Sequence, residues 1–133
     1  MIDHISLGVS NLARSRAFYD IVLATLGQRR VMNINDDPNY AASGYGSAET
    51  EPQFWIGCGK GEVTAPVPPE GQHIAFGAAD RRSVDDFYDA ALAAGAKDNG
   101  RPGLRQEYHP NYYAGFVIDP DGYHLEAVCH KPA

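Results

Sequence analysis

Two histidines and a glutamate, His4, His73 and Glu126, are of the residue types that hold a catalytic metal ion. Two imidazole nitrogens and one carboxylate can bind such an ion and still leave coordination positions open for water or substrate. A single histidine is more often a hydrogen-bonded core or surface residue, and a single glutamate near a strand end is usually solvated. The positions of the three residues in the chain must therefore carry the prediction.

The two histidines occupy equivalent positions in an internal repeat. Residues 3–27 align without a gap with residues 72–96, and eight of the 25 aligned positions are identical. The offset of 69 residues is too long for a solenoid, whose repeats run to about 20 to 50 residues. A duplicated half-domain explains the repeat, and the equivalence of the two histidines strengthens the case for a shared role.

Each copy is expected to begin with a strand and to continue with a helix. His4, Ser6 and Gly8 alternate with apolar residues, which is the period of a half-buried strand, and residues 73–78 repeat the pattern. Apolar residues at helical spacing then follow in both copies: Phe18, Tyr19, Val22 and Leu23, and later Val84, Phe87, Tyr88, Ala91 and Leu92. Gly27 and Gly95 are expected just beyond these helices, and Ser83 is expected to cap the second one.

Short extended runs divided by turn residues follow each helix. They span 27–33, 42–47 and 53–59 in the first copy, and 111–118 and 123–128 in the second, where a tight turn at 119–122 has the sequence DPDG. We therefore predict one α+β domain with two βαβββ modules, over 1–61 and 72–130, joined by a Pro- and Gly-rich linker at 62–71. The two half-sheets are expected to form a curved mixed sheet around a central pocket.

The strand alternation also predicts which side chains face that pocket. In the last strand Leu125 and Ala127 point toward the helix, so Glu126 points the other way. The same reasoning directs His4 and His73 away from their helices. All three candidate ligands are thus expected on the concave side.

The chain resembles the vicinal oxygen chelate superfamily, which includes glyoxalase I, extradiol dioxygenases, fosfomycin-resistance enzymes and bleomycin-resistance proteins. The matching segments cover nearly the whole chain: DHISLGVSNLARSRAFYD, GQHIAFGA and HPNYYAGFVIDPDGYHLEAV. The resemblance implies that His4, His73 and Glu126 hold a divalent ion, which would be Fe, Mn, Zn or Ni. It also implies a homodimer.

The resemblance implies a fourth ligand position on the last strand of the first module. An offset of 71 places Trp55 there, opposite Glu126, and a register slip of two residues would place Gln53 there instead. Glyoxalase I-like members carry a carboxylate at this position that serves as ligand and base. A set of two histidines and one glutamate is closer to the extradiol dioxygenase pattern, which uses Fe(II).

Aromatic residues are expected to form the pocket walls. Flat rings with polar tips suit a small aromatic or conjugated ligand, and the segments bordering the cavity contain Tyr40, Tyr45, Trp55, Tyr108, His109, Tyr112, Tyr113 and Phe116. Trp55, Tyr45, Tyr112 and Phe116 are predicted to bind the ligand. His109 and Tyr113, with Glu126, are predicted to be catalytic, because ionisable groups beside a metal can move protons.

Two function classes stay open. The first is a metal-dependent enzyme, a lyase or dioxygenase acting on a small oxygen-chelating substrate; the alternative is a non-enzymatic binding or resistance protein, and a decayed site is a third possibility. A net charge of -6 with scattered basic residues argues against nucleic acid as a partner. The lack of a long apolar run or a secretory start favours a cytoplasmic protein without membrane partners. GCGKG at 57–61 is expected to be a turn, and the Cys129-His130 pair is not expected to bind metal.

Overall fold

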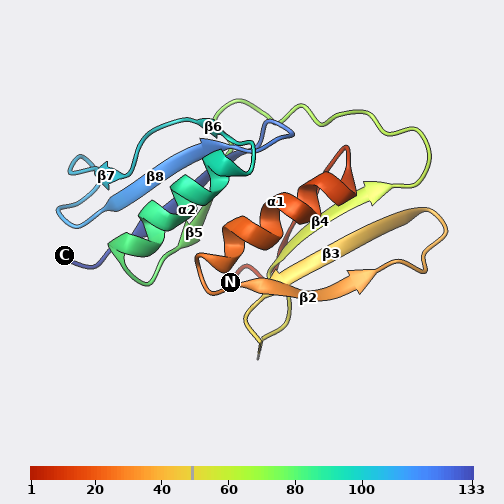
Figure 1. Cartoon of the computed structure of the whole chain (residues 1–133), viewed down its shortest axis with the longest axis horizontal. Helices are drawn as coiled ribbons and strands as arrows, with labels where there is room; N and C mark the ends of the chain where they lie inside the picture. Colours follow the sequence, from red (N-terminus) through yellow and green to blue (C-terminus); the bar gives the residue numbers. More distant parts are fainter. Residues whose placement is uncertain (49) are drawn as a thin grey trace. The chain divides into compact units, whose positions relative to one another are not determined.

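The chain forms two compact units, Met1–Val67 and Pro68–Ala133 (Figure 1). The structure, a computed structural model, describes residues 1–48 and 50–133. Each unit contains one helix and one mixed sheet, which confirms the α+β class. Residues 60–73, between the last strand of the first unit and the first strand of the second, form neither helix nor strand.

The first unit has four strands and one helix. In chain order these are β1 (Ile5–Gly8), α1 (Leu12–Ala24), β2 (Arg29–Ile34), β3 (Tyr40–Gly46) and β4 (Phe54–Gly59). The strand order in the sheet is β1-β4-β3-β2, with β1 parallel to β4 and the other pairs antiparallel. The helix contacts β2, β3 and β4. Its predicted apolar stripe is buried there, and Leu7 and Val9 of the first strand segment are buried as well.

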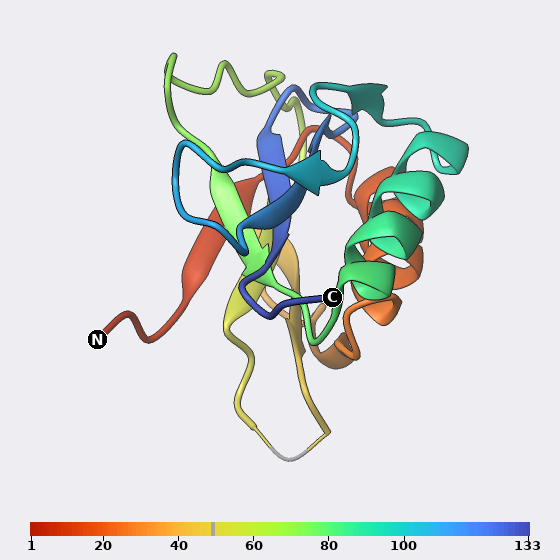
Figure 2. The ribbon, with the colours of Figure 1, turned by 90° about the vertical axis from the view of Figure 1, so that its left-hand side faces the viewer.

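The second unit repeats this plan. Its elements are β5 (Ile74–Gly77), α2 (Arg81–Ala93), β6 (Lys97–Asp98), β7 (Gly103–Leu104), β8 (Tyr113–Ile118) and β9 (His124–Cys129). The strand order is β5-β9-β8-β6, and β7 also pairs with β8. Figure 2 shows α2 along one face of this sheet, where it contacts β8 and β9. The opposite face of the sheet carries the candidate ligands of this unit.

The second unit departs from the predicted βαβββ pattern between its helix and β8. Two strands of two residues each, β6 and β7, stand where the first unit has the six-residue strand β2. The connection between them contains Gly100, at a φ of 138°, and Pro102. A left-handed glycine and a proline interrupt a regular ladder, so two short pieces replace one strand.

The helix boundaries follow local capping. Asn11 caps α1 by accepting a hydrogen bond from the Arg14 backbone at 3.0 Å. The prediction that Ser83 caps α2 is wrong: the cap is Asp80, whose Oδ1 accepts from both the backbone N and the hydroxyl of Ser83, each at 2.8 Å. Asp and Asn are strong N-caps, and the helix begins at Arg81 because Asp80 already satisfies its first free donor. None of the helices in the described part of the chain is long and apolar enough to cross a membrane.

The strand register confirms the predicted equivalence of Trp55 and Glu126. In the first unit Ser6 of β1 pairs with Trp55 of β4, and in the second unit Ala75 of β5 pairs with Glu126 of β9. Ser6 and Ala75 are themselves 69 residues apart. The two units therefore place a tryptophan and a glutamate at the same point of the same fold.

The DPDG turn fixes the register of β8 and β9. The backbone N of Asp119 donates to the Tyr123 carbonyl at 2.8 Å, and its buried carboxylate accepts from the backbone of Asp121 and Tyr123. Gly122 has a φ of 94°, which the turn requires of it. The resulting pairing sets Glu126 opposite Phe116.

Candidate functional site

Glu126 is a buried carboxylate on the face of the second sheet that points away from α2. It is 1% exposed, while its neighbours Leu125 and Ala127 lie on the face that α2 covers. Strand alternation explains the opposite directions of these side chains. A carboxylate in this position must be paired, because an isolated buried charge is strongly unfavourable.

Two partners hold the two oxygens of Glu126. The hydroxyl of Tyr112 donates a short hydrogen bond to Oε1, and Nε2 of His73 lies 3.2 Å from Oε2. The His73 side chain is 52% exposed and stands directly before β5. The structure thus brings together two of the three predicted metal ligands, both within the second unit.

Tyr112 keeps its proton through the neutral pH range. Burial, followed by the hydrogen bond to Glu126 and the charge of that carboxylate, raises the pKa of Tyr112 to about 12. The phenol is therefore a donor to Glu126 and not a base.

Tyr113, predicted to be catalytic, lies on the other face of the sheet. It pairs with Cys129 in the ladder, its hydroxyl donates to Asp85 of α2 at 2.6 Å, and the Arg81 guanidinium stacks over its ring. That hydrogen bond and burial raise the pKa of Tyr113 to about 12. Of the two adjacent tyrosines, Tyr112 is the one that reaches Glu126.

His109, the other predicted proton carrier, contacts Tyr112 and His130. Its Nδ1 accepts a hydrogen bond from the Asn111 backbone at 3.1 Å, so its Nε2 carries the hydrogen that faces His130 Nδ1 at 2.6 Å. Both imidazole rings meet the Tyr112 ring edge-on, at centroid distances of 5.4 and 5.2 Å. Tyr108 packs on the same ring at 4.9 Å. These rings surround the tyrosine that holds Glu126.

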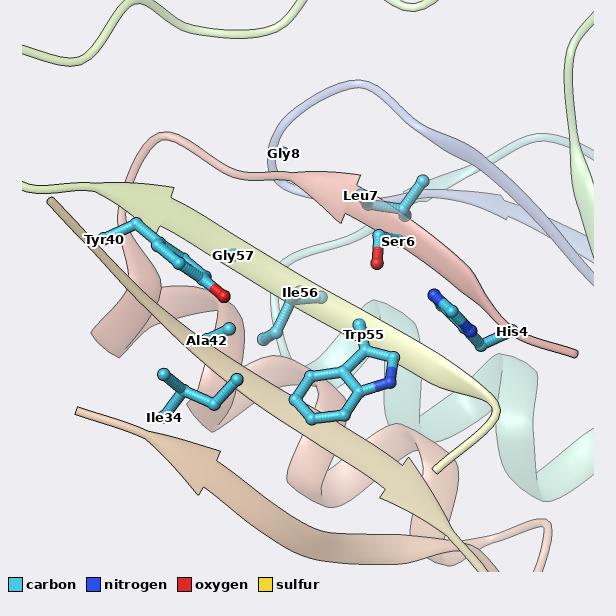
Figure 3. A pocket seen from close by; sticks show the side chains of 10 residues that line it. All are labelled: His4, Ser6, Leu7, Gly8, Ile34, Tyr40, Ala42, Trp55, Ile56 and Gly57. Atoms are coloured by element: carbon cyan, nitrogen blue, oxygen red, sulfur yellow. The ribbon is translucent and has the colours of Figure 1, made fainter. Parts of the chain in front are cut away.

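The first unit has a pocket on the corresponding part of its sheet. Its volume is about 380 Å³, within the range of small-molecule sites. The lining includes His4, Ser6, Ile34, Tyr40 and Trp55. Figure 3 shows the Trp55 ring near the centre, with His4 at one end and Tyr40 at the other. The pocket wall is mainly apolar, and Trp55 is part of it.

His4, the predicted first ligand, has a polar partner of its own. Its Nδ1 lies 2.6 Å from Oδ1 of Asp3, and its side chain is 52% exposed. A carboxylate on one imidazole nitrogen orients the ring and leaves the other nitrogen free to bind a ligand.

Two residues predicted to bind ligand have other surroundings. Tyr45 is 1% exposed and packs against Tyr19 and Phe54, while its hydroxyl donates to Asp20 of α1 at 2.8 Å. It belongs to the core beneath the helix, because the β3 alternation turns it away from the pocket. Phe116 does share the face of Glu126, but the Arg105 guanidinium stacks on its ring at 5.3 Å.

A family model described as the Glyoxalase/Bleomycin resistance protein/Dioxygenase superfamily matches residues 1–127. The chain belongs to this superfamily. Three solved structures of similar fold illustrate the relation. A glyoxalase/bleomycin resistance protein from Albidiferax ferrireducens T118 is 26% identical, with a TM-score of 0.72 and 98% coverage of both chains. No curated protein matches the chain.

Two glyoxalase I structures share the superfamily fold at lower identity. The E144Q mutant of glyoxalase I from Zea mays is 24% identical, with a TM-score of 0.75 over 96% of this chain and 46% of that chain. The trypanothione-dependent glyoxalase I from Leishmania major is 24% identical, with a TM-score of 0.67 over 98% and 86%. At this level of identity the likeness concerns the fold.

Superfamily members are generally metal-dependent, and the donor chemistry of the second unit fits a divalent ion. A neutral imidazole nitrogen beside a carboxylate oxygen is a usual pair of ligands for Zn, Fe, Mn or Ni. In the part of the chain that the structure describes, no three His, Cys, Asp or Glu side chains gather as a complete metal-binding group. The third predicted ligand, His4, belongs to the first unit.

His130 is the site residue that the sequence interpretation missed. It follows Glu126 and Val128 at a spacing of two, so the alternation of β9 already predicts it on the face of Glu126. The same period along β8 selects Tyr112, Ala114 and Phe116 for that face. The predicted run 111–118 already contained Tyr112, and extending the run 123–128 by two residues would have set His130 opposite it.

Proposed function

We propose that the protein is a metal-dependent enzyme that acts on a small substrate with neighbouring oxygen atoms, with His4, His73 and Glu126 as the metal ligands. The observation that carries the proposal is the pair formed by the buried Glu126 carboxylate and His73, 3.2 Å apart. The proposal is finer than superfamily membership, which covers enzymes and binding proteins alike.

The surroundings of Glu126 argue against a purely structural role. The other residues of β9 from Leu125 to Cys129 are apolar and buried, so an apolar side chain would pack there without a desolvation penalty. In the first unit the equivalent position holds Trp55. A carboxylate kept in this strand, with one oxygen beside a half-exposed imidazole, is suited to binding a cation.

The residues of the second unit would have different roles at such a metal centre. When bound, a divalent ion supplies Lewis acidity that stabilises negative charge developing on substrate oxygens. Glu126 would contribute negative charge, and His73 would contribute a neutral nitrogen. Tyr112 would hold the carboxylate in place through the hydrogen bond from its hydroxyl.

Trp55 favours a three-ligand centre over one of glyoxalase I type. An indole offers neither a metal ligand nor a base, and Trp55 stands at the position equivalent to Glu126. Two histidines and one glutamate leave positions open for two substrate oxygens or for a substrate and O₂. We therefore favour chemistry of the dioxygenase kind.

Metal binding tests the proposal directly. Protein freed of metal with a chelator is titrated with Mn(II), Fe(II), Zn(II) and Ni(II), and the bound ion is counted by mass spectrometry. We expect one ion per chain. In Glu126→Gln the metal affinity should fall more than about 100-fold, because mutating a residue that only hydrogen-bonds to a ligand already lowers affinity 10- to 100-fold.

Asp85→Asn is the matched control for that titration, because Asp85 is a tyrosine-bound carboxylate of the same unit that lies on α2. Its affinity should equal that of the wild type. If none of the four ions binds stoichiometrically, the enzyme proposal fails. If His4→Ala binds as tightly as the wild type, His4 is not a ligand.

A second candidate function, metal-free binding of a small flat molecule, is favoured by the apolar pocket around Trp55. Trp55 is the single tryptophan of the chain and lines the pocket, so its fluorescence reports occupancy. Catechols and other flat aromatic compounds that quench this fluorescence equally with and without chelator would support the binding function. Quenching that requires the metal would support the enzyme.

A further inference from the structure

We propose that Tyr112 is a positioning residue that makes Glu126 a metal ligand through one oxygen. The proposal rests on the function proposed above and adds a residue to it. It concerns the hydrogen bond from the Tyr112 hydroxyl to Glu126 Oε1.

The two oxygens of Glu126 have different surroundings. Oε1 accepts a hydrogen bond from the Tyr112 hydroxyl, and Oε2 faces His73 Nε2 at 3.2 Å. A carboxylate oxygen that accepts a phenol hydrogen bond is a weaker donor to a cation, and the phenol hydrogen occupies the space on that side. Oε2, beside the imidazole, is then the oxygen better placed to bind a metal ion.

The Tyr112 ring is itself held in place. Tyr108, His109 and His130 meet its edges or faces at centroid distances of 4.9, 5.4 and 5.2 Å. The two histidines are tied to each other by a hydrogen bond of 2.6 Å, and the backbone of Asn111 fixes the His109 ring. Such a set restricts the rotamer of Tyr112 and hence the direction of its hydroxyl. The arrangement matches what a ligand-orienting hydrogen bond needs.

The adjacent tyrosine provides a matched control. Tyr113 also donates to a carboxylate, Asp85, at 2.6 Å, but it does so on the face that α2 covers. Removing one hydroxyl from either residue is the same chemical change. Only the change at Tyr112 should affect the metal.

The experiment compares Tyr112→Phe with Tyr113→Phe in the full chain loaded with Co(II) and Mn(II). We expect Tyr112→Phe to weaken metal affinity 10- to 100-fold, the usual effect of removing a partner of a ligand. We also expect its Co(II) absorption spectrum to change, because a freed Oε1 adds a second carboxylate oxygen to the ion. Tyr113→Phe should keep the wild-type affinity and spectrum.

The outcomes separate this inference from the proposed function. If wild type binds metal, Glu126→Gln loses it and Tyr112→Phe retains both affinity and spectrum, Tyr112 has no positioning role although the metal site stands. If wild type binds no metal, both proposals fall. Should Tyr112→Phe not fold, His130→Ala, at an exposed residue, loosens the set around Tyr112 and should shift the Co(II) spectrum in the same direction; an unchanged spectrum would overturn the inference.

Discussion

Trp55 occupies the pocket of the first unit because its cross-strand partner has no side chain. Gly44 of β3 pairs with Trp55 of β4. A Cβ at Gly44 would lie 2.7 Å from Cβ of Pro52 and 3.0 Å from Cε2 of Trp55. Real atoms do not approach so closely, and the proline ring cannot swing aside. Glycine at residue 44 therefore leaves the space that Trp55 and Pro52 occupy.

We predict that Gly44→Ala destabilises the protein by about 1–3 kcal/mol, the usual cost of overpacking. It should also shift the Trp55 fluorescence maximum as the indole moves. Urea denaturation and emission spectra measure both effects. Gly8→Ala is the control, since a Cβ there meets nothing within 4 Å. An equal loss of stability in both variants would contradict the packing argument.

The buried carboxylate of Glu126 destabilises β9 unless both of its oxygens have polar partners. The wild-type carboxylate depends on Tyr112 and His73 for its partners, and losing one partner of a buried charge is unfavourable. We predict that Tyr112→Phe lowers the free energy of unfolding of the metal-free protein by about 1–3 kcal/mol, measured by urea denaturation. In Glu126→Gln the same tyrosine change should cost less, because a neutral amide needs its partner less. Equal costs in the two backgrounds would contradict the coupling.

At the scale of elements, each helix is tied to its sheet by a tyrosine and an aspartate. Tyr45 of β3 donates to Asp20 of α1, and Tyr113 of β8 donates to Asp85 of α2. In the first unit Arg30 of β2 also pairs with Asp20 at 3.1 Å. Burial and the neighbouring carboxylate raise the pKa of Tyr45, as the Asp85 bond and burial do for Tyr113. These hydrogen bonds last while the phenols stay protonated.

Alkaline conditions should therefore weaken the contact between α2 and its sheet. Tyr113 has a pKa of about 12 in the native state and about 10 when unfolded. Because the native state holds this proton more tightly, its stabilising effect is complete below pH 10 and is lost as the pH rises toward 12.

We predict that wild type loses about 1–2 kcal/mol more than Tyr113→Phe between pH 9 and pH 11.5, allowing for partial exposure of the phenol. Urea denaturation at a series of pH values measures this difference. Parallel pH profiles for the two proteins would show that Tyr113 does not contribute.

At the scale of the whole molecule, the duplication has produced two units with different sites. One unit presents an aromatic pocket with His4 and Trp55, and the other presents a buried carboxylate with His73 and Tyr112. Both sheets place the first strand of the unit beside the last one, β1 beside β4 and β5 beside β9, so at this point the difference lies in the side chains. At equivalent positions, Trp55 gives the first unit an apolar surface and Glu126 gives the second unit a charged one.

Each sheet also ends in edge strands, and β2 is the longest of them among the described residues. Exposed edges favour association with another chain, and superfamily members often form dimers. We predict a homodimer in solution. Light scattering after gel filtration should give twice the mass of the chain, and the mass of one chain would contradict this prediction.

The sequence by itself determined the repeat, the two helices, the long strands and the equivalence of His4 with His73 and of Trp55 with Glu126. The spacing of apolar residues in strands and helices is a local property of the sequence. Because the chain contains the same pattern twice, each copy supports the interpretation of the other. The sequence also contained the choice of Tyr112 over Tyr113, since a spacing of two along β8 and β9 puts Tyr112, Glu126 and His130 on one face.

Only the tertiary structure decided which polar groups meet. The Tyr112 bond to Glu126 and the His109 bond to His130 join residues that are 14 and 21 positions apart, and such pairings depend on register and rotamer rather than on residue type. The burial of Tyr45 beneath α1 and the break of one strand into β6 and β7 were likewise settled by packing. The alternation along a strand predicts which face of the sheet a side chain lies on. Its hydrogen-bond partner depends on which other residues the tertiary structure places on that face.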